Sequence, residues 1–225
     1  IFILQTFVFN TFVFLENYKM FLENPVNHKE QFGWIEVICG SMFSGKTEEL
    51  IRRLKRAQFA KQKIEIFKPA IDVRYDDDLV TSHDSNQIPS TPVPAAANIP
   101  ILADGCDVVG IDEAQFFDDE IVQVCNALAN RGVRVIIAGL DMDFEGNPFG
   151  PMPALMATAE YVTKVHAVCT RTGNPAHYSF RKSDLKDLVV LGEKENYEPL
   201  SRAAYNKAIK RLDGKKDTGS ENKNK

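Results

Sequence analysis

The architecture of this chain follows from one motif, Gly40-Ser41-Met42-Phe43-Ser44-Gly45-Lys46-Thr47. The motif comes after an apolar run at 35–39, which is typical of a short buried strand, and before a sequence at 48–54 that is typical of a helix start. A strand, then Gly-x-x-x-x-Gly-Lys-Thr, then a helix is the context in which this pattern forms a phosphate-binding loop. The sequence therefore predicts that residues 40–47 bind a nucleoside triphosphate.

The residue types in this loop match the chemistry of phosphate binding. Glycines let the backbone approach closely enough for successive N–H groups to point at phosphate oxygens. The helix that follows adds the partial positive charge of its N-terminus. We expect Lys46 to reach the outer phosphates and to take part in catalysis, and the Thr47 hydroxyl to bind Mg²⁺.

Strand-like and helix-like segments alternate from Gly33 onward. The predicted strands are 35–39, 63–69, 108–112, 133–141 and 161–168, and the predicted helices are 45–61 and 118–131. Gly132 stands where a helix C-terminal glycine belongs, and the proline-rich stretch 70–100 is predicted to be a long loop. This alternation predicts an α/β fold, a RecA-like P-loop domain with a mainly parallel sheet and helices on both faces.

The chain divides into four predicted parts. They are an N-terminal extension at 1–32, the phosphate-loop domain at 33–168, a small polar subdomain at 169–212 and a disordered tail at 213–225. The subdomain is predicted to be a β-ribbon or loop region that ends in a short helix near 200–212. The extension is apolar but too short and too polar to span a bilayer. Two interpretations stay open: residues 1–19 precede the true initiator Met20, or they form a hydrophobic arm.

Composition limits the possible functions. The 225 residues carry a formal net charge of −4, which argues against a protein that coats nucleic acid, because such proteins are usually basic. The four cysteines have no short-spaced pair and so predict neither a disulfide framework nor a four-cysteine metal site. We expect reduced thiols in a cytosolic protein, with Cys39 and Cys125 in the core.

A second nucleotide motif, Asp112-Glu113-Ala114-Gln115, lies at the end of the predicted strand 108–112. The carboxyl ends of strands in such sheets face the ligand. We therefore expect Asp112 to hold Mg²⁺ through water. Glu113, one residue further on, should project in a different direction from Asp112. It is the candidate base that takes a proton from an attacking hydroxyl. The alternative is that Glu113 is a solvated loop carboxylate.

Two classes of function fit these motifs. Asp-Glu-Ala-Gln also resembles the second motif of nucleic-acid helicases, so a helicase-like P-loop NTPase is one alternative. Helicases need two phosphate-loop-type domains, however. This chain has one phosphate loop and a negative net charge. A small-molecule kinase fits the length better.

Together, the motifs closely resemble the cellular, tetrameric (type II) thymidine kinases over roughly residues 33–212. The matching segments are 40–47, Lys68 to Tyr75, Ser82-His83-Asp84, Asp112 to Phe117, Gly139-Leu140-Asp141, Phe144, Asn147 to Gly150, Tyr197 and Tyr205. The resemblance implies transfer of the γ-phosphoryl group of ATP to the 5′-hydroxyl of thymidine. It also implies a cytoplasmic homotetramer that needs Mg²⁺ and has no nucleic-acid or membrane partner.

The resemblance also assigns site residues. Glu113 would be the catalytic base, and Asp72, Arg74, Ala114 and Gln115 would lie near the ATP held by residues 40–47. Met42, Phe116, Leu140, Phe144 and Phe149 would surround thymidine, against the alternative of ordinary core packing for the phenylalanines. A C-terminal lasso loop would close on the base through the main chain of Leu188, Val189, Val190, Leu191 and Gly192, with Tyr197 at the sugar.

The lasso departs from the family pattern at one point. Family members commonly bind a structural zinc there with two Cys-x-x-Cys pairs, a strong zinc signal. In this chain Cys169 is followed by Thr172 in the second ligand position, and Ser201 and Ala204 stand in the third and fourth. Neutral hydroxyls are poor zinc ligands beside thiolates, so we expect no structural zinc. A site rebuilt from Cys169 with His166 and His177 is the alternative.

Overall fold

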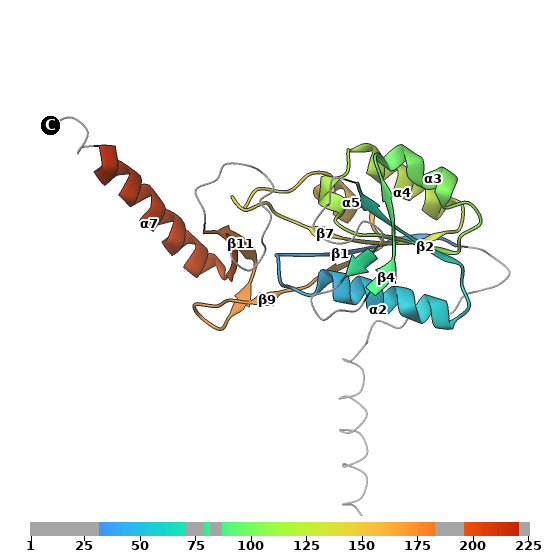
Figure 1. Cartoon of the computed structure of the whole chain (residues 1–225), viewed down its shortest axis with the longest axis horizontal. Coiled ribbons are helices and arrows are strands. Elements are labelled where there is room, and N and C mark those ends of the chain that lie inside the picture. Colours follow the sequence, from blue (N-terminus) through green and yellow to red (C-terminus); the bar gives the residue numbers. More distant parts are fainter. Residues whose placement is uncertain (1–31, 71–78, 82–86, 183–195, 221–225) are drawn as a thin grey trace, which may run out of the picture. The chain divides into compact units, whose positions relative to one another are not determined.

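The central element is a six-stranded sheet whose neighbouring strands are all parallel (Figure 1). The computed structural model describes residues 32–70, 79–81, 87–182 and 196–220. The strand order is β5-β2-β6-β7-β1-β8. The strands are β1 (Trp34–Gly40), β2 (Ile64–Pro69), β5 (Thr91–Val93), β6 (Val108–Ile111), β7 (Arg134–Leu140) and β8 (Tyr161–Lys164). The predicted α/β class with a parallel sheet is confirmed.

Helices cover both faces of this sheet, as predicted (Figure 1). Successive strand residues point to opposite faces, so β7 sends Ile136 toward α2 (Lys46–Phe59) and Ile137 toward α4 (Glu120–Asn130). The side of α4 also carries α3 (Ile99–Leu102) and α5 (Met152–Thr158). Each face therefore has its own apolar core, and a strand buried on both sides has to be apolar throughout.

The predicted helices at 45–61 and 118–131 are present as α2 and α4, each one or two residues shorter at its ends than predicted. Both helices bury apolar residues at helical spacing; they are Leu50, Ile51, Leu54, Ala57, Ile121, Val124, Cys125 and Leu128. Gly132 has a φ of 89° just beyond the end of α4, a conformation that glycine adopts without the steric cost of a side chain. Helical spacing of apolar residues was thus a sufficient signal for these two elements.

Two predictions about the secondary structure of residues 70–168 are wrong, and one helix in this range was missed. The stretch 70–100 is not a continuous loop, because it contains β3 (Leu79–Thr81), β4 (Gln87–Pro89), β5 and the 3₁₀ helix η1 (Ala96–Asn98), and α3 follows directly. The predicted strand 161–168 is two strands, β8 and β9 (Ala167–Val168). Helix α5 was not predicted. Strands of three residues are too short for a periodic signal, and β5 tolerates Pro92 because it is an edge strand.

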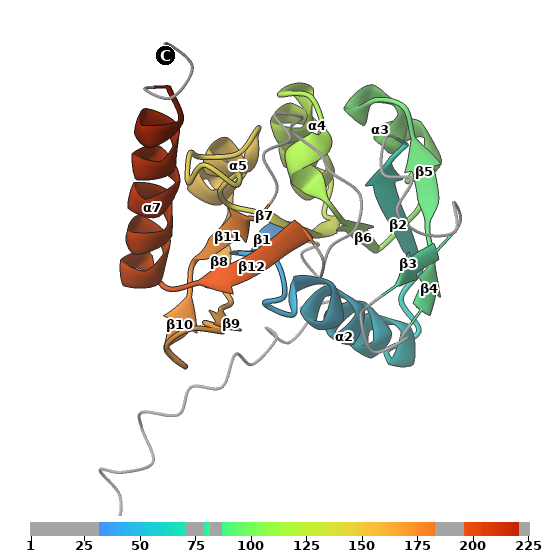
Figure 2. The same ribbon diagram turned by 60° about the vertical axis from the view of Figure 1, so that its left-hand side comes forward.

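The C-terminal part contains two small antiparallel ribbons and a helix (Figure 2). The ribbons pair β9 with β10 (Pro175–Ala176) and β11 (Tyr178–Arg181) with β12 (Tyr197–Leu200). The predicted β-ribbon is therefore present. Helix α7 (Arg202–Ser220) runs beyond the predicted limit at 212 and into the segment predicted to be a disordered tail. In the part of the chain that the structure describes, no helix is long and apolar enough to cross a membrane.

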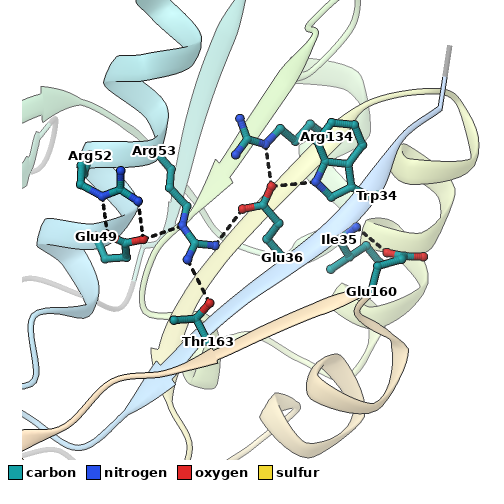
Figure 3. Close-up of polar contacts among 9 residues, drawn as sticks. All are labelled: Trp34, Ile35, Glu36, Glu49, Arg52, Arg53, Arg134, Glu160 and Thr163. Carbon is teal, nitrogen blue, oxygen red and sulfur yellow. Dashed lines mark hydrogen bonds and ion pairs between the residues drawn. The ribbon is translucent and has the colours of Figure 1, made fainter. Parts of the chain in front are cut away.

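A buried ion network joins the start of β1 to its neighbours (Figure 3). Glu36 is fully buried and accepts hydrogen bonds from Arg53 of α2 (2.8 Å), Arg134 of β7 (2.6 Å) and the indole of Trp34 (2.7 Å). Arg53 also donates to Glu49 (2.8 Å) and to Thr163 of β8 (3.0 Å). The network therefore fixes α2 against the sheet near the start of β1, whereas the phosphate loop follows the end of this strand.

Candidate active site

The loop at 40–47 connects β1 to α2, where the sequence predicted it. Gly40 has a φ of 152°, and a Cβ there would lie 2.2 Å from the carbonyl oxygen of Val165, so only glycine fits. Gly45 has a φ of 81° and caps α2. The Ser44 hydroxyl (2.7 Å) and the Lys46 ammonium (2.8 Å) both donate to the Ser41 carbonyl. The loop is therefore held by its own hydrogen bonds, with the lysine cation over it.

The two nucleotide motifs meet at the carboxyl edge of the sheet. The Thr47 hydroxyl donates to the Asp112 carboxylate at 3.3 Å, and the other oxygen of Asp112 accepts the Glu113 backbone N–H at 2.9 Å. Asp112 is 6 % exposed. A hydroxyl and a carboxylate are hard oxygen donors, and Mg²⁺ in phosphate sites needs only one or two protein ligands because it keeps several waters. Thr47 and Asp112 therefore fit a Mg²⁺ site.

Glu113 is held in an unusual backbone conformation. Its φ of 50° and ψ of 40° lie in the left-handed region, which costs a non-glycine residue of order 1–3 kcal/mol. The Gln115 amide donates to the Glu113 carboxylate and accepts the backbone N–H of Leu140 at 2.9 Å. Gln115 is buried, whereas Glu113 and Leu140 at the two ends of this bridge are half-buried. The sequence predicted that Gln115 lies beside the nucleotide. In the structure its side chain forms hydrogen bonds with Glu113 and with the end of β7.

Aromatic residues gather beside this bridge. Phe116 of the 3₁₀ helix η2 (Ala114–Phe116) meets Phe149 edge to face, with ring centroids 5.6 Å apart. Gly150, the residue after Phe149, packs so tightly that a Cβ there would lie 2.4 Å from the Gln115 carbonyl oxygen. The Gln115 side chain thus links Leu140 to Glu113, and the Phe116–Phe149 pair lies beside this bridge. The structure brings these predicted acceptor residues to the edge that carries the phosphate loop.

Strand β11 carries a second group of contacts. The Ser179 hydroxyl accepts the Met42 backbone N–H at 2.9 Å, which ties the phosphate loop to β11. Two residues on, the Arg181 guanidinium donates to the Tyr197 hydroxyl at 2.7 and 3.2 Å and lies 3.6 Å from the centroid of the Phe144 ring. Tyr197 and Phe144 were predicted to contact thymidine, so β11 connects them to the phosphate loop.

Sequence reasoning missed Ser179 and Arg181. A usable signal was present, because Tyr178-Ser179-Phe180-Arg181 alternates aromatic and polar residues as a half-buried strand does. Several predicted residues, by contrast, lie outside the described part of the chain: Asp72, Arg74, Ser82 to Asp84 and Leu188 to Gly192.

The four positions that would hold a lasso zinc come together without a zinc ligand set. The Thr172 and Ser201 hydroxyls are 3.3 Å apart, and the Ala204 backbone N–H donates to Ser201 at 3.5 Å. Burial raises the pKa of the Cys169 thiol, but hydrogen bonds with Thr172 and Ser201 outweigh this and lower the pKa to about 6. One thiol, two hydroxyls and a methyl group do not fit zinc.

The rebuilt metal site is not formed either. The His166 and His177 rings do lie together, with centroids 4.5 Å apart. Among the residues that the structure describes, however, no group of three or more His, Cys, Asp or Glu side chains could hold a metal ion. The histidine pair therefore lacks the third ligand that Cys169 would have to supply.

Comparisons with known proteins point in one direction. A family model described as "Thymidine kinase" matches residues 33–205. The thymidine kinase of Bacteroides fragilis (strain ATCC 25285) is 60 % identical over 190 residues, which are 84 % of this chain and 96 % of that protein. The thymidine kinase of Porphyromonas gingivalis (strain ATCC BAA-308 / W83) is 61 % identical over 183 residues, 80 % of this chain and 90 % of that protein. The matched segment includes the phosphate loop, β6, β7 and the β11–β12 ribbon.

Proposed function

The chain belongs to the thymidine kinase family, and from this premise we propose how its residues transfer the γ-phosphoryl group of ATP to the 5′-hydroxyl of thymidine. One observation carries the proposal: the hydrogen bond between Thr47 and Asp112 joins the phosphate loop to the strand end that bears Glu113. No comparison and no feature of the described residues favours the helicase-like alternative.

Glu113 is the proposed general base. Its carboxylate follows the buried strand β6 and is oriented by the Gln115 amide, which is itself fixed to the backbone of Leu140. A base must reach the proton that it removes, so orientation matters as much as basicity. In this role Glu113 accepts the proton of the 5′-hydroxyl as the hydroxyl oxygen attacks the γ-phosphorus, and ADP leaves.

Charge stabilisation is the proposed role of the loop. Backbone N–H groups of residues 40–47 and the Lys46 ammonium would face the phosphates, which carry most of the charge in phosphoryl transfer. Thr47 would ligate Mg²⁺ directly, and Asp112 would do so through water. Mg²⁺, when bound, supplies positive charge to the phosphate oxygens. Asp72 and Arg74 are proposed to lie near the same nucleotide.

Thymidine is proposed to bind between the phosphate-loop domain (33–168) and the lasso subdomain (169–212). The proposed contacts are Met42, Phe116, Leu140, Phe144, Phe149, Tyr197 and the main chain of 188–192. A thymine edge offers two carbonyls and one N–H, which backbone groups can match without a charged side chain. The aromatic rings supply apolar surface for the planar base.

We also propose a cytoplasmic homotetramer. The tetramer rests on the resemblance to the type II family. The cytoplasmic location is supported by the cysteines, because all four are free and buried, as expected in a reducing compartment.

A phosphoryl-transfer assay with ATP and a panel of nucleosides tests this function. We expect Mg²⁺-dependent product with thymidine and deoxyuridine and none with other nucleosides. The matched control is Lys46→Met, which keeps the length of the side chain but removes its charge, and which should lose turnover. ATP hydrolysis stimulated by nucleic acid, without nucleoside phosphorylation, would instead support the helicase-like alternative.

A further inference from the structure

Arg181 is a buried cation that contacts two of the proposed nucleoside residues, Phe144 and Tyr197. It ends β11 and is 5 % exposed, so its guanidinium is almost fully removed from water. The guanidinium lies flat enough on Phe144 for its central carbon to be 3.6 Å from the ring centroid. It also donates two hydrogen bonds, at 2.7 and 3.2 Å, to the hydroxyl oxygen of Tyr197.

The alternation of β11 explains why Arg181 points this way. Tyr178 stacks on Tyr205 of α7, with centroids 4.3 Å apart, and Phe180 meets the same ring edge to face. These two aromatic residues therefore bury one face of the strand against α7. Ser179 and Arg181 must then project from the opposite face, which is the face in contact with the phosphate loop through Met42.

We propose that Arg181 is a positioning residue for the nucleoside, acting through Phe144 and Tyr197; this inference rests on the proposed function. The guanidinium covers one face of the Phe144 ring, and in this proposal a planar base packs against the opposite face. The Tyr197 oxygen accepts two N–H groups, so its own proton is directed away from the guanidinium. That proton can be donated to an acceptor oxygen of the nucleoside.

The position along β11 separates this role from ATP binding. Ser179, which holds the phosphate loop, precedes Arg181 by two residues, about 7 Å along a strand. Arg181 contacts Phe144 and Tyr197, which are proposed only as nucleoside contacts, whereas Ser179 bonds to the backbone of the phosphate loop at Met42. A change at Arg181 should therefore alter the KM for thymidine and leave the KM for ATP nearly unchanged.

The test compares Arg181→Met and Arg181→Lys with a matched control, Arg171→Met. Arg171 also lies over an aromatic ring of β11, 5.4 Å from the centroid of Phe180, but it pairs with Glu198 rather than with a proposed nucleoside residue. We expect Arg181→Met to raise the KM for thymidine by about 10-fold or more, the loss typical of a charged hydrogen bond. Arg181→Lys should give a smaller rise, because it keeps the charge and loses the planar fork. Arg171→Met should leave this KM unchanged.

A double-mutant cycle with Tyr197→Phe distinguishes positioning from general damage. If Arg181 acts through the hydroxyl, Arg181→Met should change the KM for thymidine less in the Tyr197→Phe background than in the wild type. Additive effects, or an equal KM change in Arg171→Met, would overturn the inference; Arg181→Lys provides the same comparison if Arg181→Met does not fold. A wild-type protein that fails to phosphorylate thymidine would overturn the proposed function itself.

Discussion

Glu113 shows at the scale of a single residue how this site is prepared. Its left-handed backbone is unfavourable, yet hydrogen bonds on both sides keep it there: its N–H bonds to Asp112 and its carboxylate to Gln115. Strain of this kind persists only where the surroundings over-determine it. The carboxylate is thus held in one orientation, which would reduce the reorganisation that the proposed proton transfer requires.

Replacing Glu113 with Gln should therefore separate binding from chemistry. The amide has nearly the same shape but cannot accept a proton, so turnover should fall by about 10²-fold or more. Affinities for ATP and thymidine should remain near the wild-type values in a binding titration. Glu120→Gln, an exposed change in the first turn of α4, is the matched control and should keep full turnover. Near-normal turnover of Glu113→Gln would remove Glu113 from the role of base.

At the scale of structural elements, contacts between the β9–β10 turn and β12 stabilise the lasso subdomain. Arg171 and Thr170 both bond to Glu198 of β12, with the Arg171–Glu198 ion pair at 2.6 Å. Hydrogen bonds from Arg171 and Thr170 hold the pKa of the Glu198 carboxyl below its usual value. In the same subdomain, Cys169, Thr172 and Ser201 bond to one another. Hydrogen bonds therefore occupy the place where a metal would otherwise join the two segments.

We accordingly expect metal removal to have no effect on folding. After mild dialysis, elemental analysis should find well under one zinc per chain, and a chelator should leave the thermal unfolding midpoint unchanged. As a control, Thr172→Cys, Ser201→Cys and Ala204→Cys together would restore both Cys-x-x-Cys pairs, and this variant should retain zinc. One tightly held zinc per wild-type chain would contradict the prediction.

His177, between β10 and β11, should make stability depend on pH. Burial lowers its pKa below the ordinary 6.5, and the positive charges of His166, Lys164 and Arg202 lower it further. The unfolded chain therefore binds a proton at a higher pH than the folded chain does. The contribution of His177 to the free energy of unfolding should therefore be constant above about pH 6.5. It should fall as the pH drops below this value and through the pKa of His177 in the folded protein.

Urea unfolding at several pH values tests this linkage. His177→Asn removes the titrating group and keeps a polar side chain, so its unfolding midpoint should decline less than that of the wild type below about pH 6.5. Above this pH the plots of urea midpoint against pH should run parallel for the wild type and the variant. Curves that stay parallel down to pH 5 would exclude His177 as the cause.

At the scale of the whole molecule, we expect stability and catalysis to depend on opposite ends of β1. Its carboxyl end leads into the phosphate loop, while Glu36 near its start is enclosed by Arg53 and Arg134 (Figure 3). These side chains are 5 % exposed or less. Buried charges in such a network are costly to leave without a partner, so the network should matter for folding and little for chemistry.

Glu36→Gln tests this separation. It removes the carboxylate that Arg53 and Arg134 share, although Arg53 keeps its ion pair with Glu49. Breaking a buried ion pair typically costs about 3–5 kcal/mol of unfolding free energy. Chemical denaturation should show this loss, while kcat per folded molecule stays near the wild-type value. Arg52→Ala is the control: Arg52 pairs with Glu49 at 2.6 Å but is 53 % exposed, so its loss should cost about 0–1 kcal/mol. Equal losses in the two variants would contradict this account.

Some features of this protein could be predicted from short-range patterns. Apolar spacing predicted α2, α4 and the strands β1, β2, β6 and β7, and Gly132 marked the end of α4, because each pattern is confined to a few neighbouring residues. The motifs at 40–47 and 112–115 predicted a nucleotide site for the same reason. Both belong to a strand and the turn that follows it, so the chain itself places them at the carboxyl edge of the sheet.

Other features depend on which distant segments pack together. Nothing near Arg181 in sequence indicates Phe144 or Tyr197, and nothing near Glu36 indicates Arg134; sheet order and strand pairing bring these residues into contact. Short elements such as β5 and α5 form because the sheet edge and the core stabilise them, not because of their own propensity. Local sequence thus accounts for the strands, the main helices and the phosphate loop. The orientation of Glu113, the contacts of Arg181 and the hydrogen bond between Thr172 and Ser201 arise only in the packed molecule, since each joins groups from separate segments.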